Sequence, residues 1–172
     1  MFTLNRRFTL PLLQLCYWAA LFLASDSAMS DGLTKDKKLE VGITTHLGDK
    51  QQFQQGDRLT LLITLSDNAY LVLIYKDATN KLEQIYPNRW SAQTVFPAGY
   101  FQPFPSTTNP FEFIVSEPYG QEEVWLFASR KPFSELFFED IKKLHHSSDG
   151  PNPPMINRNT MGFSRVIIET YP

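Results

Sequence analysis

The pattern of apolar and polar positions divides this chain into three parts. A mostly apolar run covers residues 8–24, alternation with a period of two recurs through residues 39–129, and apolar residues return at helical spacing over residues 133–146. A period of two is typical of strands in a sheet, whereas spacings of three and four are typical of an amphipathic helix. The sequence therefore predicts an apolar N-terminal segment, followed by a β-rich domain with one late helix.

The strand predictions are clearest in the middle of the chain. Residues 58–65 alternate between apolar and polar, and residues 69–75 are apolar on both faces, as expected of a central strand that is covered on each side. Residues 69–86 are predicted to form a hairpin closed by a polar turn at residues 77–80. Further strands are predicted over residues 39–44, 111–115, 122–129 and 163–170. Short strands with a single late helix favour a mainly β fold, a two-layer antiparallel β-sandwich.

The segment between the hairpin and the later strands is rich in proline. It contains Pro97, Pro103, Pro105 and Pro110. Residues 90–110 are therefore predicted to be irregular, with only short edge strands, because proline cannot donate to a sheet ladder. Pro132 stands where the amphipathic helix over residues 133–146 can begin.

The N-terminal segment has the features of a secretory signal peptide. Arg6 and Arg7 precede the apolar run, and small residues after it permit cleavage behind Ser27 or behind Ser30. We therefore expect a signal peptide over residues 1–28, a flexible tether over residues 29–38 and a single domain over residues 39–172.

This assignment predicts a periplasmic or secreted protein. The alternative is an uncleaved anchor in the inner membrane, but the run contains Pro11 and Gln14 and is shorter than the about 20 apolar residues that a membrane span needs. The membrane would then be a partner only through this uncleaved leader. Removal of the leader also removes Cys16, the only cysteine, which excludes disulfides and thiolate metal sites from the mature chain.

Composition narrows the classes of ligand. Hydrophobic residues make up 42% of the 172 residues and charged residues 20%, which is typical of a folded soluble domain. The formal net charge is -2, and removal of Arg6 and Arg7 makes the remaining chain more acidic. We therefore expect no nucleic-acid partner, since proteins that bind nucleic acid carry a basic surface.

No pattern in the sequence predicts catalysis, so we expect no enzymatic activity, no metal and no cofactor. No serine stands in the Gly-x-Ser-x-Gly turn of the hydrolases. His145 and His146 are adjacent and diverge by about 100° around a helix, which favours helix-end cations over ligands of a shared metal. A calcium loop around Asp77 lacks the required spacing, so a polar hairpin turn is the preferred interpretation.

The paired carboxylates receive a similar interpretation. Glu122 and Glu123 fall on a predicted strand, and Glu139 and Asp140 fall on the predicted helix. Neighbours on a strand face opposite sides and neighbours on a helix diverge, so neither pair can flank one glycosidic bond unaided. We expect both pairs to lie on solvated faces.

The candidate binding residues are aromatic. They are Trp90, Phe96, Tyr100, Phe101 and Phe104 in the proline-rich segment and Phe138 in the helix. Rings on a stiff loop can stack on a sugar or anchor a protein partner, and they can also plug the open end of a sandwich. Both interpretations stay open for the loop. Phe138 is a candidate because the pair Phe137-Phe138 exceeds what one core-facing stripe requires.

Several short motifs occur in an order that is typical of one family. They are Gly56-Asp57-Arg58-Leu59, Asp67-Asn68-Ala69-Tyr70-Leu71, Ile85-Tyr86-Pro87-Asn88, Ala98-Gly99, Glu117-Pro118-Tyr119-Gly120-Gln121-Glu122 and Ala128-Ser129. With these motifs, residues 39–136 resemble the bacterial family known as domain of unknown function 4384. The resemblance implies an immunoglobulin-like β-sandwich on an exported or membrane-attached protein, and it transfers no catalytic residue. Such domains are sometimes appended to kinase or caspase-like peptidase domains, whereas we expect no such domain in this chain.

Together these features predict an exported, non-catalytic binding or adaptor domain that recognises a protein partner in the bacterial cell envelope or in a secretion assembly. The alternative is a glycan- or peptidoglycan-binding module that stacks sugars on Trp90 and Tyr100. A second alternative is an enzyme whose catalytic groups are scattered along the sequence. A carboxyl group with a perturbed pKa in a cleft would favour that second alternative.

Overall fold

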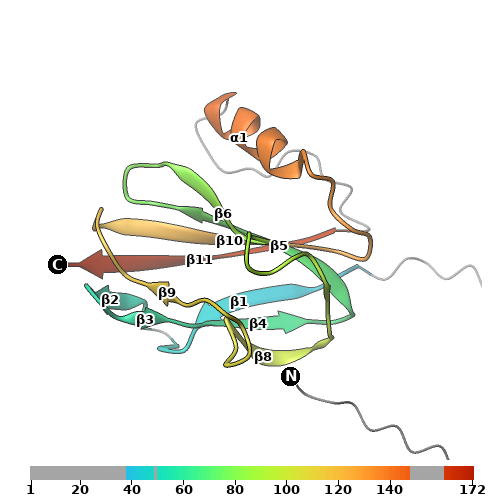
Figure 1. The fold of residues 1–172 in the computed structure, drawn as a ribbon, viewed down its shortest axis with the longest axis horizontal. Coiled ribbons are helices and arrows are strands. Elements are labelled where there is room, and N and C mark those ends of the chain that lie inside the picture. Colours follow the sequence, from blue (N-terminus) through green and yellow to red (C-terminus); the bar gives the residue numbers. More distant parts are fainter. Residues whose placement is uncertain (1–37, 49, 148–160) are drawn as a thin grey trace, which may run out of the picture. The chain divides into compact units, whose positions relative to one another are not determined.

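The computed structural model describes residues 38–48, 50–147 and 161–172, which form a β-sandwich with one helix (Figure 1). The expected signal peptide and nearly all of the expected tether lie outside the described residues. Among the described residues the strand pairs are antiparallel with one exception, and the fold is mainly β. This arrangement confirms the predicted immunoglobulin-like antiparallel β-sandwich with one late helix.

The smaller sheet contains three antiparallel strands in the order β1-β4-β8. Their bounds are β1 Val41–Thr45, β4 Leu61–Leu65 and β8 Gly99–Phe104. Every second residue of β4 is buried, as the strict alternation of the sequence predicted. β8 belongs to the segment expected to be irregular, and it is an edge strand, the position in a sheet where a proline such as Pro103 is tolerated.

The larger sheet has the strand order β2-β11-β10-β5-β6, and β7 also pairs with β5. The bounds are β2 Gln52–Gln54, β5 Ala69–Lys76, β6 Leu82–Tyr86, β7 Val95–Phe96, β10 Gln121–Ser129 and β11 Met161–Tyr171. β2 runs parallel to β11, whereas the other pairs of this sheet are antiparallel. The predicted hairpin is confirmed as β5 and β6, and the C-terminal strand pairs within its own domain.

A short ladder joins β3 Arg58–Leu59 to β9 Phe113–Ile114, so the strand predicted over residues 111–115 is only two residues long. Two further backbone hydrogen bonds extend this pairing into the turn before β3. The Gly56 N–H donates to the Val115 carbonyl at 2.9 Å, and the Val115 N–H donates to the Asp57 carbonyl at 3.0 Å. Gly56 has a φ of 87°, which a residue with a side chain rarely adopts, so this glycine permits the turn.

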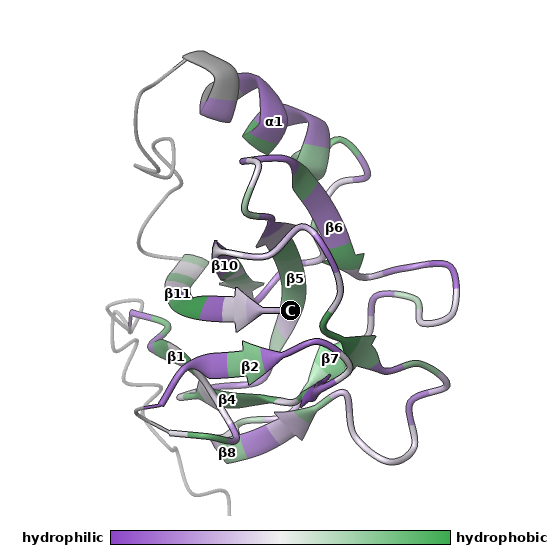
Figure 2. Ribbon diagram, turned by 90° about the vertical axis from the view of Figure 1, so that its left-hand side faces the viewer, coloured by the Kyte–Doolittle hydropathy of each residue, from purple (hydrophilic) through white to green (hydrophobic). Residues whose placement is uncertain are grey.

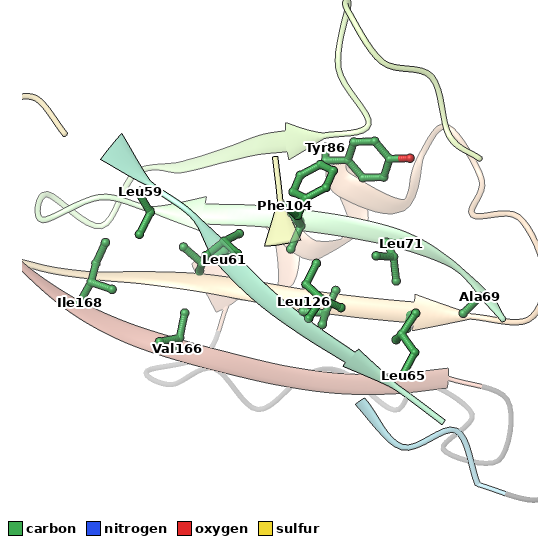
Figure 3. Close-up of a cluster of buried hydrophobic side chains, with 14 of the residues drawn as sticks. Leu59, Leu61, Leu65, Ala69, Leu71, Tyr86, Phe104, Leu126, Val166 and Ile168 are labelled. Atoms are coloured by element: carbon green, nitrogen blue, oxygen red, sulfur yellow. The ribbon is translucent and has the colours of Figure 1, made fainter. Parts of the chain in front are cut away.

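The main core lies between the two sheets (Figure 3). Buried side chains from both sheets meet there, among them Leu61, Leu65, Leu71, Leu126, Val166 and Ile168. Burial of one such side chain contributes about 1.5–3 kcal/mol. This core therefore accounts for much of the favourable free energy of folding.

A second, smaller core lies on the opposite face of the larger sheet, under the helix (Figure 2). Its buried residues are Val72, Ile74, Trp125, Phe127 and Ile141. In Figure 2, the helix lies on one side of the larger sheet, and β1, β4 and β8 lie on the other side. β5 thus buries alternate side chains in each core, which confirms that this strand is covered on both faces.

The helix α1 Phe137–Ser147 begins later than the predicted start at residue 133. The Phe133 N–H donates to the side-chain oxygen of Gln93 at 3.0 Å, and a turn follows in which the Phe137 N–H bonds the Ser134 carbonyl at 3.1 Å. This tertiary hydrogen bond holds Phe133 outside the helix, although its ring still packs on Phe137 with centroids 4.6 Å apart. Nowhere in the described ranges does a helix have the length and apolar character that crossing a membrane demands.

Candidate functional site

Three of the aromatic residues expected to bind a partner are exposed. Tyr100 and Phe101 are neighbours on β8, where they are 80% and 65% exposed. Trp90 lies in the loop after β6 and is 54% exposed. Its ring contacts Phe111 and, within the described residues, neither Tyr100 nor Phe101. We therefore treat Tyr100 and Phe101 as a separate surface and call them the exposed pair.

Phe104, Phe96 and Phe138 contribute to the cores instead. Phe104 is 3% exposed, and its ring centroid lies 5.0 Å from that of Tyr86 and 6.2 Å from that of Phe96. Phe138 is partly buried against the second core, and the ammonium group of Lys142 lies 4.8 Å from the centre of its ring. The structure thus places Phe104 in the interior and packs the partly buried Phe96 against it, as in the plug interpretation.

A β-bulge positions the exposed pair. The pairing of β4 with β8 shifts register between Ile63 and Leu65, so that both members of the pair stand opposite Thr64. Phe101 has a φ of 52°, in the left-handed region, and its N–H reaches the Thr64 hydroxyl oxygen at 3.4 Å. A side chain in this region costs about 1–3 kcal/mol, and such strain is concentrated at functional sites.

The loop that carries Trp90 is held by its own hydrogen bonds. The side-chain oxygen of Asn88 accepts the N–H of Trp90 at 2.9 Å and that of Ser91 at 3.0 Å. The Arg89 guanidinium lies over the Trp90 ring, 3.9 Å from its centroid. The Phe111 ring lies 6.5 Å away at an angle of 28°. The indole is therefore exposed, but part of its ring is already covered.

Glu122 and Glu123 are buried, which shows that the expectation of a solvated face was wrong for this pair. They are 2% and 7% exposed. As neighbours on a strand they face opposite sides, Glu122 towards the main core and Glu123 towards the second core. Neither face of β10 is solvated, because β10 lies inside the larger sheet with a core on each side. Glu139 and Asp140 on α1 are exposed as expected.

The Glu123 carboxylate is fully paired. One oxygen lies 2.6 Å from the Lys76 ammonium nitrogen. The other accepts the indole N–H of Trp125 at 2.8 Å and a guanidinium N–H of Arg165 at 3.3 Å. Burial alone would raise the pKa of Glu123, but the hydrogen bonds from Lys76 and Trp125, together with the charges of Lys76 and Arg165, lower it.

Glu122 lines a cleft of about 410 Å³ that β6 and the segment around β9 enclose. The apolar part of the lining includes Leu59, Ile85, Phe113, Val115, Val124 and Ile168. The ionisable part includes Tyr75, Asp77, Lys81, Glu83, Glu112 and Glu117. The cleft is therefore apolar on one part of its wall and rich in carboxylates on the other.

The Glu122 carboxyl group is not fully paired. Its Oε1 atom is buried without a hydrogen-bond partner. Burial raises the pKa of Glu122, the Tyr75 and Thr170 hydroxyls oppose that shift, and the negative charge of Asp77 adds to it. The pKa of Tyr75 is also raised, mainly by burial and further by the interaction with Glu122. A carboxyl group with a perturbed pKa in a cleft is the feature that favours an enzymatic site.

Asp77 closes the hairpin turn between β5 and β6. Its Oδ1 atom accepts the N–H of Thr79 at 2.8 Å, the hydroxyl of Thr79 at 2.7 Å and the N–H of Lys81 at 2.9 Å. Partial burial would raise the pKa of Asp77, but these hydrogen bonds lower it. Asp77 is therefore a residue of a polar hairpin turn, as preferred from the sequence.

Within the described ranges, no group of three or more His, Cys, Asp or Glu side chains is arranged to hold a metal ion.

One protein family matches this chain. Residues 52–132 fit the family model described as Domain of unknown function (DUF4384). This part of the chain belongs to the DUF4384 family. The matched segment runs from β2 to just beyond β10, so the DUF4384 domain contains Trp90, the exposed pair and Glu122. No curated protein matches the chain.

Hydrogen bonds within the DUF4384 domain join several of its short motifs. The side-chain oxygen of Asn68 accepts the N–H of Ala98 at 2.7 Å. An oxygen of the neighbouring Asp67 pairs with the Arg130 guanidinium at 2.9 Å. These contacts tie the turn before β5 to the start of β8 and to the end of β10. The motifs therefore have architectural roles.

The cleft was missed in the sequence, because four separate parts of the chain line it: Leu59, residues 75–85, residues 112–124 and Ile168. The sequence did contain one signal. Glu122 has the same parity along the strand as the apolar Val124 and Leu126. A carboxylate at an inward-facing position of a covered strand therefore indicated a special environment.

Proposed function

We propose that this chain is an exported, non-catalytic binding domain that recognises a protein partner in the bacterial cell envelope or in a secretion assembly, and that the exposed pair is its contact surface. The observation that carries the proposal is the pair itself. Two adjacent aromatic side chains are 80% and 65% exposed on an edge strand. Large apolar side chains gathered on a surface mark sites of interaction.

The backbone at Phe101 supports a contact role. Its left-handed conformation is strained for a residue with a side chain, and the exposed ring recovers little of that cost through packing. Glycine would adopt the same φ with less strain, so stability does not explain phenylalanine at this position. A partner that buries the ring would explain it, since aromatic side chains contribute much of the energy at the centre of an interface.

The partner that fits this surface presents an apolar pocket to the two rings. A partner strand added to the free edge of β8 fits less well, because the bulge and Pro103 interrupt a regular ladder. Side chains that enter a pocket need no such ladder. The proposed contact is therefore made by side chains.

The geometry of Trp90 makes the glycan-binding alternative less favourable. Sugar rings stack on an open aromatic face. The Arg89 guanidinium already lies 3.9 Å above the centre of the Trp90 ring, so a sugar on that face would have to displace it. The ring of Tyr100 is open to solvent. Within the described residues, however, it makes no contact with the ring of Trp90.

Export is the part of the proposal that rests on sequence alone. Arg6 and Arg7 followed by an apolar run are typical of a cleaved leader, and the proposed location is the periplasm or the medium. Mass spectrometry of the protein from the periplasmic fraction is expected to find a new N-terminus between residues 28 and 31. A full-length N-terminus in the membrane fraction would instead support the uncleaved anchor.

The binding proposal is tested by affinity purification from the native envelope after mild cross-linking. We expect a discrete protein to be retained by the wild type and by Leu136→Ala, which removes an exposed apolar side chain far along the chain from β8. The same protein is expected to be lost with Tyr100→Ala. If Tyr100→Ala retains the protein as well as the wild type does, the exposed pair is not part of the contact. Failure of a folded, processed wild type to retain any protein would favour the glycan-binding alternative.

Glu122 separates the proposal from the enzymatic alternative. If the domain acts only through the exposed pair, Glu122→Gln leaves capture of the partner unchanged. If the cleft is an active site, the same substitution abolishes the cellular function while capture persists. A genetic complementation assay run beside the purification distinguishes these outcomes.

A further inference from the structure

Glu122 is a buried carboxyl group that lacks a cation. It is 2% exposed, and Oε1 has no hydrogen-bond partner in the protein. The hydroxyls of Tyr75 and Thr170 interact with the group but carry no positive charge. A buried carboxylate without a counter-charge is costly, so its place in the wall of a cleft calls for an explanation.

Glu123 shows how this fold satisfies a buried carboxylate on the other face of the same strand. Lys76 lies 2.6 Å and Arg165 lies 3.3 Å from its oxygens. The cleft around Glu122 does contain Lys81, but within the described residues Lys81 forms no ion pair with Glu122. Cations of the protein pair with Glu123. A ligand can take the corresponding position beside Glu122.

The cleft offers both an apolar wall and a negative potential. Leu59, Phe113 and Ile168 provide apolar surface beside Glu122. The volume of about 410 Å³ lies within the range of about 300–1,000 Å³ that is typical of small-molecule sites. The carboxylates outnumber the single lysine in the lining, so the potential there favours a cation.

We propose that this cleft binds a primary alkylammonium or alkylguanidinium group, whose charge pairs with the Glu122 carboxylate and whose apolar stem packs on the wall of the cleft. The side chains of lysine and arginine and the free diamines share this chemistry. The proposal does not depend on the exposed pair, because the two sites have no residue in common.

A divalent metal ion fits the cleft less well. Calcium takes about six to eight oxygen ligands, and magnesium takes six in near-ideal geometry. Within the described part of the chain, no group of three or more carboxylate or histidine side chains is arranged for such an ion. An organic cation needs one charge-assisted hydrogen-bonded partner and an apolar wall, and the cleft provides both.

Binding is expected to strengthen as the pH rises, because the ionised form of Glu122 is the one that pairs with the cation. Burial raises the pKa of Glu122, so part of this change falls above the usual range of a glutamate. Six other charged or titratable groups line the cleft, whereas β3 and β11 contribute only the apolar Leu59 and Ile168. The six groups are Tyr75 and Asp77 from β5 and its turn, Lys81 and Glu83 from the other side of the hairpin, and Glu112 and Glu117 beside β9.

Isothermal titration calorimetry on the protein purified from cells tests the proposal. The probes are Nα-acetyl-lysinamide for a peptide side chain, putrescine for a free diamine, and the neutral Nα,Nε-diacetyl-lysinamide. We expect at least one cation to bind and the neutral analogue to bind about tenfold more weakly or not at all. Glu122→Gln is expected to weaken cation binding by about thirtyfold or more, since it removes a buried charge partner.

Glu40→Gln is the matched control, because Glu40 is exposed and lies outside the lining of the cleft. It is expected to leave binding unchanged, and thermal unfolding of both variants verifies the fold. Binding of the lysinamide alone identifies a peptide side chain as the ligand, and binding of putrescine alone identifies a free diamine. The proposal is overturned if neither cation binds, if the neutral analogue binds equally well, or if Glu122→Gln binds as the wild type does.

Discussion

Glu122 and Glu123 are neighbours in the sequence, yet they lie on opposite faces of β10, and only Glu123 is paired with cations. Both are buried, so the difference comes from what the neighbouring strands present to each face. The side with the second core offers Lys76 and Arg165, whereas the side with the main core offers the Tyr75 and Thr170 hydroxyls. The two residues therefore make opposite contributions to the pH dependence of stability.

Glu123→Gln is expected to destabilise the domain by about 3 kcal/mol at neutral pH, because it leaves the partly buried Lys76 without its counter-charge. The folded-state pKa of Glu123 is lowered, so its stabilisation is complete above the unfolded value of about 4.3 and is lost as the pH falls. Urea denaturation measures the effect. The control is Glu112→Gln, which breaks the solvent-exposed salt bridge between Glu112 and Arg58. It is expected to cost less than about 1 kcal/mol. Equal losses in the free energy of unfolding for the two variants would contradict the stabilising role of the Glu123–Lys76 pair.

Glu122→Gln is expected to stabilise the domain at neutral pH. Because the folded-state pKa of Glu122 is raised, the native state binds more protons than the unfolded chain as the pH rises above about 4.3, and stability is lost over that window. Glutamine keeps the shape without the charge. The gain in the free energy of unfolding is therefore expected to be absent at pH 3 and to grow towards pH 7. A gain that does not change with pH would show that ionisation is not its cause.

Gly162→Ala is expected to destabilise the domain by about 1–3 kcal/mol, because β11 passes close to the start of the domain. A Cβ atom at this position would lie 2.6 Å from a methyl carbon of Val41 and 3.0 Å from the Leu39 carbonyl oxygen. Gly42→Ala is the matched control on β1, since its Cβ would meet Thr64 at an ordinary 3.6 Å. Thermal unfolding compares the two. Similar midpoints would mean that the close approach of β1 and β11 is absent.

Phe101→Gly is expected to leave the domain as stable as the wild type or more stable by about 0.5–1 kcal/mol, although glycine normally weakens a strand. The reason is the φ of 52°, which glycine adopts without strain. Phe101→Ala removes the same ring and keeps the strain, so it isolates the backbone effect. Denaturant unfolding of both variants measures the difference. Both variants lack the ring, so a Phe101→Gly variant less stable than Phe101→Ala would contradict backbone strain at this position.

Local patterns sufficed to predict most of the strands, whereas contacts between distant segments were out of reach. β5 was identified because an apolar run on both faces requires two cores, and both exist. The start of α1 was missed because Gln93, far away in the sequence, accepts the N–H of Phe133. β8 is an edge strand, as predicted for this segment, but its six residues exceed the short edge pieces expected there, because an edge strand tolerates Pro103.

For the candidate site residues too, local patterns could be read from the sequence, whereas contacts between distant segments could not. Composition identified an aromatic segment, but only the fold separates the buried Phe104 from the exposed pair three and four positions before it. Alternation placed Glu122 and Glu123 on opposite faces, and the error lay in taking those faces as solvated. The segments that line the cleft come together through the pairings of β5 with β6 and β10, of β3 with β9 and of β10 with β11, all of which join distant parts of the sequence.

The most direct test of the proposed function is photo-cross-linking from position 100 in intact cells. A photoreactive phenylalanine replaces Tyr100 in one variant and Leu136 in the other, because both side chains are largely exposed on different parts of the domain. We expect one discrete protein adduct from position 100 and none from position 136. Adducts of equal yield from both positions, or none from position 100 in a folded and exported protein, would contradict a contact through the exposed pair.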